Sequence, residues 1–200
     1  MELYTFPISP NGKRARIAAA ELGIPLALRD LDFGKGENRA PDYLALNPTG
    51  KVPTLKDGDF GLWESAAIMC YLAQTRPGPL WTGDAKTDAD TLRWLFFCSC
   101  HIDPYFTTLV VERFIKARRG EPADDAQTAA AERWLARFVP VVEGQLGRGD
   151  YVTGRFGLAD IALGCTLELS GPVRYDLAPY PAIRAWLARL QSRPSWYKTM

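Results

Sequence analysis

Short strand-like runs alternate with helical segments in the first third of the chain. Apolar and polar residues alternate over residues 2–6, and the Ala-rich stretch 13–22 ends at Gly23 and Pro25, as a helix does. The rest of this part predicts strands at residues 26–31, 51–56 and 60–63 and helices at residues 41–46 and 64–72. A strand–helix–strand unit followed by a hairpin and a helix predicts a mixed sheet, because the first needs a parallel crossover and the second an antiparallel pair.

The remainder of the chain has the spacing of helices and no convincing strand. Residues 90–119 predict one long helix, which Pro104 should kink because proline lacks an N–H and its ring clashes with the preceding turn. Three further helices are predicted at residues 125–146, 158–169 and 181–191. We therefore expect an α/β domain with a mixed sheet at residues 1–76, a linker at 77–87 and an all-helical domain at 88–200.

Composition removes several classes of function. The chain has 200 residues with 24 Lys and Arg against 23 Asp and Glu, so a net charge of +1 gives no electrostatic reason to expect nucleic acid or an anionic membrane as partner. No apolar run approaches the ~18 to 20 residues that span a bilayer. The start Met-Glu-Leu-Tyr lacks the features of a signal peptide, so we expect a cytoplasmic protein.

The cysteines predict neither a metal site nor a redox pair. Cys70, Cys98, Cys100 and Cys165 are unevenly spaced without a C-x-x-C pair, and only His101 lies near them as another soft ligand. We expect four reduced thiols and no bound metal.

The stretch from Asn47 to Leu55 is the first candidate for chemistry. A turn there runs into an apolar strand with Pro53 near its start, and proline removes a hydrogen-bond donor from a sheet. Two interpretations stay open. The segment is a plain edge strand, or a cis Val52–Pro53 bond presents the backbone of Val52 to an extended ligand as a neighbouring strand would.

Two helix starts carry polar side chains. Glu64-Ser65 can cap a helix, or can offer a hydroxyl and backbone N–H groups to a carboxylate while Glu64 pairs with an ammonium. In the turn Ser9-Pro10-Asn11-Gly12, Ser9 is either a simple N-cap or, with Asn11, part of a donor set that stabilises an anion such as a thiolate.

In this order, the three elements resemble the thioredoxin-like domain of the cytosolic glutathione transferase superfamily, and the helical remainder resembles its C-terminal domain. The resemblance implies glutathione as co-substrate and a cis peptide bond at Pro53. It further implies that Val52 binds the cysteinyl backbone of glutathione and that Glu64 and Ser65 hold its γ-glutamyl end.

The Ser9-Pro10-Asn11-Gly12 turn, with Gly34-Lys35-Gly36 further on, resembles bacterial nu-class members and related fungal proteins. That likeness implies that Ser9 and Asn11 stabilise the thiolate. Asn38 and Lys51 are candidates for the glycyl end. No cysteine occupies the turn, which disfavours the classes that form a mixed disulfide with glutathione.

The helical part implies the second substrate site and the oligomer. Family members usually carry Ser or Thr three residues before an Asp at the start of a buried helix, and here the matching residues are Gly157 and Asp160; glycine is an acceptable N-cap. The resemblance further implies a homodimer, which the long helix with Trp94 would help to form. For the electrophile we expect residues near the start of the helical domain, although side chains at such spacing are more often core; the candidates are His101, Tyr105, Phe106, Leu109 and Arg113.

Three functions remain open at this point. The first is conjugation of glutathione to a small hydrophobic electrophile. The second is reduction of disulfides or peroxides with glutathione, which the nu-like turn favours. The third is a non-catalytic binding or regulatory protein, as in stringent-starvation proteins of this fold. The intact set of polar residues speaks against the third and does not separate the first two.

Overall fold

The computed structural model describes residues 1–76 and 78–197, which divide into two units. The first unit comprises Met1–Thr82 together with the segment that begins at Arg193, and the second comprises Gly83–Ser192. The domain boundaries expected from the sequence stay predictions.

A four-stranded mixed sheet organises the first unit. Its strands are β1 (Glu2–Thr5), β2 (Ala27–Asp30), β3 (Thr54–Asp57) and β4 (Phe60–Trp63), in the order β2-β1-β3-β4. β1 and β2 are parallel, whereas β3 is antiparallel to both β1 and β4, which confirms the predicted mixed sheet. Because β3 lies between two strands, the interpretation of Pro53 as part of an edge strand is wrong.

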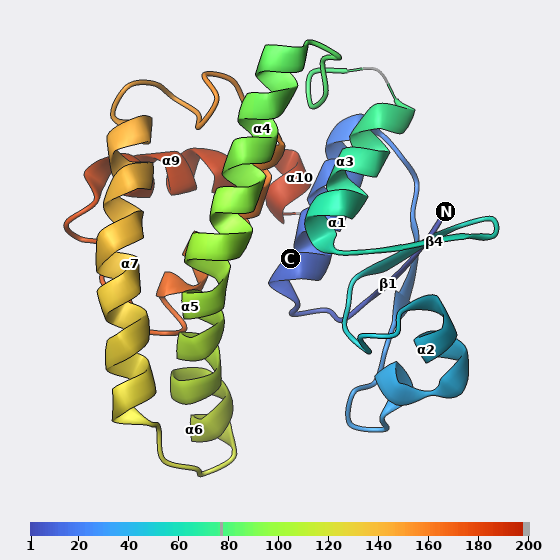
Figure 1. Cartoon of the computed structure of the whole chain (residues 1–200), viewed down its shortest axis with the longest axis horizontal. Coiled ribbons are helices and arrows are strands. Elements are labelled where there is room, and N and C mark those ends of the chain that lie inside the picture. The colour runs from blue at the N-terminus through green and yellow to red at the C-terminus, as the bar shows by residue number, and fades with distance from the viewer. Residues whose placement is uncertain (77, 198–200) are drawn as a thin grey trace. The chain divides into compact units, whose positions relative to one another are not determined.

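Helices pack against both sides of this sheet. Figure 1 shows α1 (Pro10–Leu22) and α3 (Ser65–Thr75) side by side on one face and α2 (Pro41–Leu46) on the other. The small side chains of Ala15, Ala18 and Ala19 are buried on α1 and allow a close approach. A short 3₁₀ helix, η1 (Glu37–Arg39), precedes α2.

The end of the described chain returns to α1. The guanidinium of Arg193 donates to both carboxylate oxygens of Glu21 at 2.9 and 2.8 Å, and Ser195 donates to the same carboxylate. In α10 (Pro194–Tyr197), Trp196 is 1% exposed, with the Lys13 ammonium 5.2 Å from its ring centre. Sequence analysis did not predict this return.

The second unit is built from helices. The predicted helix 90–119 is continuous but heterogeneous, because Pro104 lacks an N–H and its ring displaces the preceding turn. The chain accommodates it with a π-helical segment, in which the N–H of Asp103 donates to the carbonyl of Cys98. The parts of this long helix are α4 (Ala85–Phe97), η2 (Cys98–Ile102), α5 (Asp103–Leu109), η3 (Val110–Ile115) and α6 (Lys116–Arg118).

The other helices of this unit match their predicted bounds closely. They are α7 (Asp125–Leu146), α8 (Leu158–Leu167), the 3₁₀ turn η4 (Glu168–Ser170) and α9 (Pro181–Gln191). Every residue of α8 is buried, so this helix forms the centre of the unit. No strand occurs in the described residues of this unit.

Asp160, at the start of α8, is the main polar group of that centre. Its carboxylate accepts from the N–H groups of Val152 and Gly157 at 3.0 and 2.9 Å and from the indole of Trp186, on α9, at 2.8 Å. Burial raises the pKa of Asp160 to about 6, against the opposing effect of these donors. Gly157 is the N-cap residue of α8, as the sequence indicated.

Three further observations concern the described residues only. None of their helices combines the length and the hydropathy needed to cross a membrane. No group of three or more His, Cys, Asp or Glu side chains among them could hold a metal ion. The four cysteines form no disulfide: Cys98 and Cys165 are buried, Cys70 is half-buried and Cys100 is exposed.

Candidate functional site

The sheet register brings three distant parts of the sequence to one end of the sheet. Tyr4 pairs with Thr54, and Thr54 pairs with Trp63. Continuing both ladders by one residue places Pro53 between Thr5 and Glu64. At this end β1 runs out toward α1, β3 begins and β4 runs into α3. The Ser9 turn, the Val52–Pro53 bond and the Glu64-Ser65 pair therefore all follow from the same end of the sheet.

Ser9 acts as the N-cap of α1. Its backbone is extended, with φ −72° and ψ 119°, and its hydroxyl oxygen accepts from the N–H of Gly12 at 3.1 Å. A serine hydroxyl can accept and donate at the same time, so its proton stays available to a second partner. The capping interpretation and the anion-binding interpretation of Ser9 are thus compatible.

Gly12 holds this turn against the sheet. A Cβ atom at Gly12 would lie 2.1 Å from Oγ1 of Thr5, so no side chain fits there without a shift of the backbone or of Thr5. Glycine allows α1 to start directly on β1, which sets the position of Ser9 and Asn11.

A buried arginine joins the starts of α1 and α3. Nη1 of Arg14 donates to Oδ1 of Asn11 at 2.7 Å and to Oγ of Ser65 at 3.3 Å. The Ser65 hydroxyl in turn lies 3.3 Å from Oδ1 of Asn11. Arg14 is only 3% exposed and Ser65 only 7%. The sequence did not mark Arg14 as a site residue, because a cation in an Ala-rich helix usually points to solvent; its place three residues after Asn11 was the available signal.

Glu64 adopts a backbone conformation that is unusual for a residue with a side chain. Its φ is 72° and its ψ is 115°, and such strain is concentrated at functional sites. The side chain is exposed and caps no N–H group of α3. The capping interpretation of Glu64 is therefore wrong, and its carboxylate faces solvent.

The Val52–Pro53 peptide bond is cis, as the ligand-binding interpretation required. Asn47, which is 2% exposed, organises the turn before it. Nδ2 of Asn47 donates to the carbonyl of Lys51 at 2.8 Å and to Oγ1 of Thr54 at 2.9 Å, and Oδ1 accepts from the N–H of Thr49 at 3.0 Å. The sequence pattern gave no separate role to Asn47, although this residue opens the motif.

Asn38 and Lys51 lie in the loops beside this turn. Nδ2 of Asn38 donates to the carbonyl of Gly50 at 2.8 Å, so this amide group supports the loop. The side chain of Lys51 is exposed, while its carbonyl oxygen accepts from Tyr43 and Asn47. Burial raises the pKa of Tyr43, so its hydroxyl keeps its proton and remains a donor.

The five candidates in the second unit do different things. Phe106 and Leu109 are 1% and 0% exposed and belong to the core. Arg113 donates to the carbonyl of Val173 at 3.1 Å and pairs with Glu132 on α7 at 2.6 Å. The two remaining candidates are partly exposed members of an aromatic cluster: His101 lies 4.6 Å from the ring of Phe138, and Tyr105 stacks on Trp134 at 5.7 Å.

Comparisons with known proteins agree on one family. Residues 1–74 match the model of the glutathione S-transferase N-terminal domain, and residues 93–194 match that of the C-terminal domain. A protein named glutathione S-transferase F10, from Arabidopsis thaliana, is 33% identical over 197 residues, which cover 95% of this chain and 92% of the Arabidopsis protein.

Two solved structures extend the similarity to ligand complexes. The theta-class glutathione S-transferase of Xanthomonas axonopodis pv. citri, solved with glutathione bound, superposes with a TM-score of 0.90 at 29% identity, covering 99% of this chain and 95% of that one. The glutathione transferase URE2P6 of Phanerochaete chrysosporium, in complex with oxidised glutathione, gives 0.88 at 27% identity, covering 99% and 93%. With both domain models matched along the chain, this protein belongs to the glutathione S-transferase family.

Proposed function

We propose that Ser9 and Asn11 stabilise the thiolate of bound glutathione and promote its attack on a small hydrophobic electrophile. The observation that carries this proposal is the start of α1. There the Ser9 hydroxyl keeps a proton to donate and the Asn11 amide lies two residues away, both at the positive end of a 13-residue helix.

The rest of the glutathione molecule fits the neighbouring groups. The backbone of Val52, before the cis bond, binds the cysteinyl residue as an adjacent strand would. The exposed carboxylate of Glu64 pairs with the γ-glutamyl ammonium, and Ser65 with the first N–H groups of α3 receives the α-carboxylate. Asn38 and Lys51 serve the glycyl end. Two structural relatives, one solved with glutathione and one with oxidised glutathione, support the proposal that this chain binds glutathione.

The required stabilisation of the thiolate is modest. A thiol of pKa ~8.5 is only a few per cent ionised at pH 7, and the thiolate is the nucleophile. Lowering the pKa by about two units needs about 2.7 kcal/mol of differential stabilisation. Two charge-assisted hydrogen bonds and a helix terminus supply an amount of this order.

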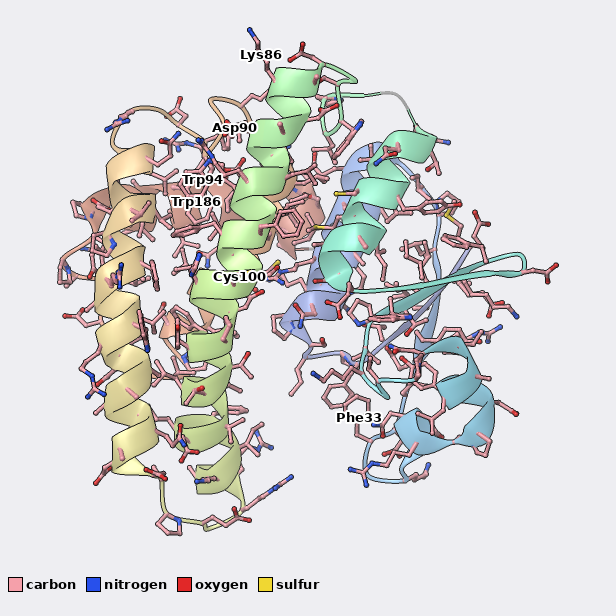
Figure 2. The ribbon with its side chains drawn as sticks, viewed as in Figure 1. Phe33, Lys86, Asp90, Trp94, Cys100 and Trp186 are labelled. Atoms are coloured by element: carbon pink, nitrogen blue, oxygen red, sulfur yellow. The ribbon has the colours of Figure 1, made fainter. Side chains whose placement is uncertain are left out.

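An apolar surface beside Ser9 suits a hydrophobic second substrate. Phe6, three residues before Ser9, stacks on Phe33, with ring centres 5.0 Å apart and planes 11° apart. Phe33 follows β2 and is 42% exposed (Figure 2). In the second unit the partly exposed His101, Tyr105 and Arg113 remain the proposed contacts, whereas Phe106 and Leu109 act there through packing.

A second candidate reaction uses the same thiolate. The turn that holds Asn11 resembles that of the bacterial nu class, and this likeness favours glutathione-dependent reduction of disulfides or peroxides. The fungal relative that was solved with oxidised glutathione supports this alternative. We propose that the chain is of this bacterial nu-class-like type and uses glutathione as co-substrate without a metal.

We further propose that the protein is a cytoplasmic homodimer. Large apolar side chains on helices of the second unit are exposed, with Phe96 at 66%, Val141 at 48% and Trp134 at 43%. Val141 lines a groove of about 440 Å³ with Trp94 and Phe97. A second copy of the chain would cover exposed apolar side chains of this kind.

Calorimetry and turnover test the function together. Glutathione is titrated into the protein, and initial rates are then measured with an aromatic halide, a glutathione mixed disulfide and an organic peroxide. Conjugation supports the first reaction and reduction the second. Absence of glutathione binding would remove the assignment of the site, and unchanged rates in both Ser9→Ala and Asn11→Ala would remove these two residues from it.

A further inference from the structure

Arg14 is a buried cation that donates hydrogen bonds to residues of the proposed glutathione site. Its side chain lies on the inner side of α1, is 3% exposed, and donates to two residues to which the proposed function gives roles. Arginine stays protonated in proteins and has no acceptor atom. Any oxygen that forms a hydrogen bond with its guanidinium group must therefore be the acceptor.

This constraint orients the Asn11 amide. An asparagine side chain has one acceptor end and one donor end. Because Arg14 can only donate, the atom 2.7 Å from its Nη1 must be Oδ1, and the NH₂ group of Asn11 must point away from Arg14. The Ser65 hydroxyl, 3.3 Å from the same Oδ1, strengthens that preference. Asn11 itself is exposed, so its NH₂ group is accessible to a ligand.

We propose that Arg14 is a positioning residue that locks Asn11 with its amide NH₂ group directed at the glutathione sulfur. The inference rests on the proposed function and adds to it which atom of Asn11 works and what fixes that atom. The charge of Arg14 also polarises the amide, since hydrogen bonds in a chain strengthen one another. Arg14 acts on the thiolate through Asn11 and touches neither the sulfur nor the second substrate.

The first test leaves Arg14 in place. Asn11→Asp keeps an oxygen toward Arg14 but replaces the NH₂ group by a second acceptor, whereas Asn11→Ala removes both ends. Asn11→Asp is expected to melt at or above the wild-type temperature because it forms an ion pair with Arg14. Asn11→Ala melts lower, and both variants raise the pKa of the bound glutathione thiol. A melting temperature of Asn11→Asp below that of Asn11→Ala overturns the proposed orientation.

The second test is a double-mutant cycle between Arg14 and Asn11. Arg14→Met is expected to raise the pKa of the bound thiol by about one unit, a roughly tenfold loss of thiolate below that pKa. The dissociation constant of glutathione changes by less than about tenfold. If Arg14 acts through Asn11, adding Asn11→Ala to Arg14→Met raises the pKa little further. Fully additive shifts would mean that Arg14 does not position Asn11.

Two controls separate this inference from the proposed function and from folding. Arg29→Met, at an exposed arginine of β2, leaves the thiol pKa unchanged. If the wild type neither binds glutathione nor lowers its thiol pKa, the proposed function fails first. If the wild type binds glutathione and lowers its thiol pKa, and Arg14→Met shows the same thiol pKa, then only the proposed role of Arg14 fails. Should Arg14→Met not fold, the Asn11→Asp comparison decides without any change at Arg14.

Discussion

The two units use buried polar groups in opposite ways. In the first, Arg14, Asn11 and Ser65 come from two helix starts and meet at one end of the sheet, where Asn11 is exposed. In the second, carboxylates accept from the unit's own N–H groups: the buried Asp160 at the start of α8, and the half-buried Glu143 of α7 from the first N–H groups of α9.

The difference separates a site from a scaffold. A polar cluster that leaves a donor at the surface can bind a ligand, whereas one whose acceptors are all occupied by N–H groups of its own unit holds helices together. We therefore expect substitutions in the first cluster to change chemistry more than stability, and substitutions in the second to change stability more than chemistry.

Asp160→Ala should give the largest effect. It leaves the N–H groups of Val152 and Gly157 and the indole of Trp186 without their acceptor inside a buried helix start. We expect a loss of about 3 to 5 kcal/mol in the free energy of unfolding, measured in urea. Asp150→Ala, at an exposed aspartate paired with Arg189, is the matched control and should lose far less. A loss below about 1 kcal/mol in Asp160→Ala would break the distinction between the units.

Asp160 and Glu21 make contributions to stability that change with pH in opposite directions. The pKa of Asp160 is about 6 in the folded protein against 3.8 unfolded, so folding takes up a proton and its contribution to stability falls as pH rises from 4 to 6. Two pKa units correspond to about 3 kcal/mol. At Glu21, burial alone would raise the pKa, but hydrogen bonds from Arg193 and Ser195 lower it below 4.5. Its contribution is present above pH 4.5 and is lost as pH falls further.

Urea midpoints measured from pH 3 to 7 check these signs. Asp160→Asn should flatten the wild-type dependence between pH 4 and 6, and Glu21→Gln should flatten it below pH 4.5. A variant with the wild-type slope would contradict the assignment of that carboxylate.

Gly12→Ala tests the contact that positions the Ser9 turn. The new Cβ would lie 2.1 Å from Oγ1 of Thr5, so the turn or the strand must move, at a cost of about 1 to 3 kcal/mol. The Thr5 hydroxyl has no hydrogen-bond partner among the described residues, so Thr5→Ala removes the clash without breaking a bond. We expect the double variant to recover most of the stability and activity that Gly12→Ala loses. Equal losses in both would show that the close approach is not the cause.

Ser9 should give the smallest change in stability together with a clear change in chemistry. Ser9→Ala loses the N-cap and about 1 kcal/mol, whereas Ser9→Gly loses only a few tenths. Both lack the hydroxyl and should raise the bound thiol pKa equally. If Ser9→Gly retained the wild-type pKa, capping would be the whole role of Ser9.

Most helices and strands of this chain could be predicted because the residues that start and end them lie close together in the sequence. The bounds of α2, α7 and α9 follow from proline, periodicity and breakers, and the turn at Asp57–Asp59 predicted the β3–β4 hairpin. The π-helical segment before Pro104 could not be predicted, since periodicity says that proline disturbs a helix but not how neighbours absorb it.

The site residues also divide into those that the sequence predicts and those that it does not. Ser9, Asn11, Pro53 and Ser65 stand at turns or helix starts, where residue type and position carry information. Arg14 meets Ser65 only after two distant segments come together, so this contact cannot be read from local patterns. The contacts of Arg14 with Asn11 and of Asn47 with Lys51 are local, but neither residue type marks them out in the sequence.

The most direct measurement is a pH titration of the ultraviolet thiolate absorbance of glutathione bound to the wild type and to Ser9→Gly. The wild type is expected to show a thiol pKa about two units below that of the free thiol, and Ser9→Gly is expected to return most of the way with little loss of stability. A bound thiol with the pKa of free glutathione in the wild type would contradict the central claim that the start of α1 stabilises a thiolate.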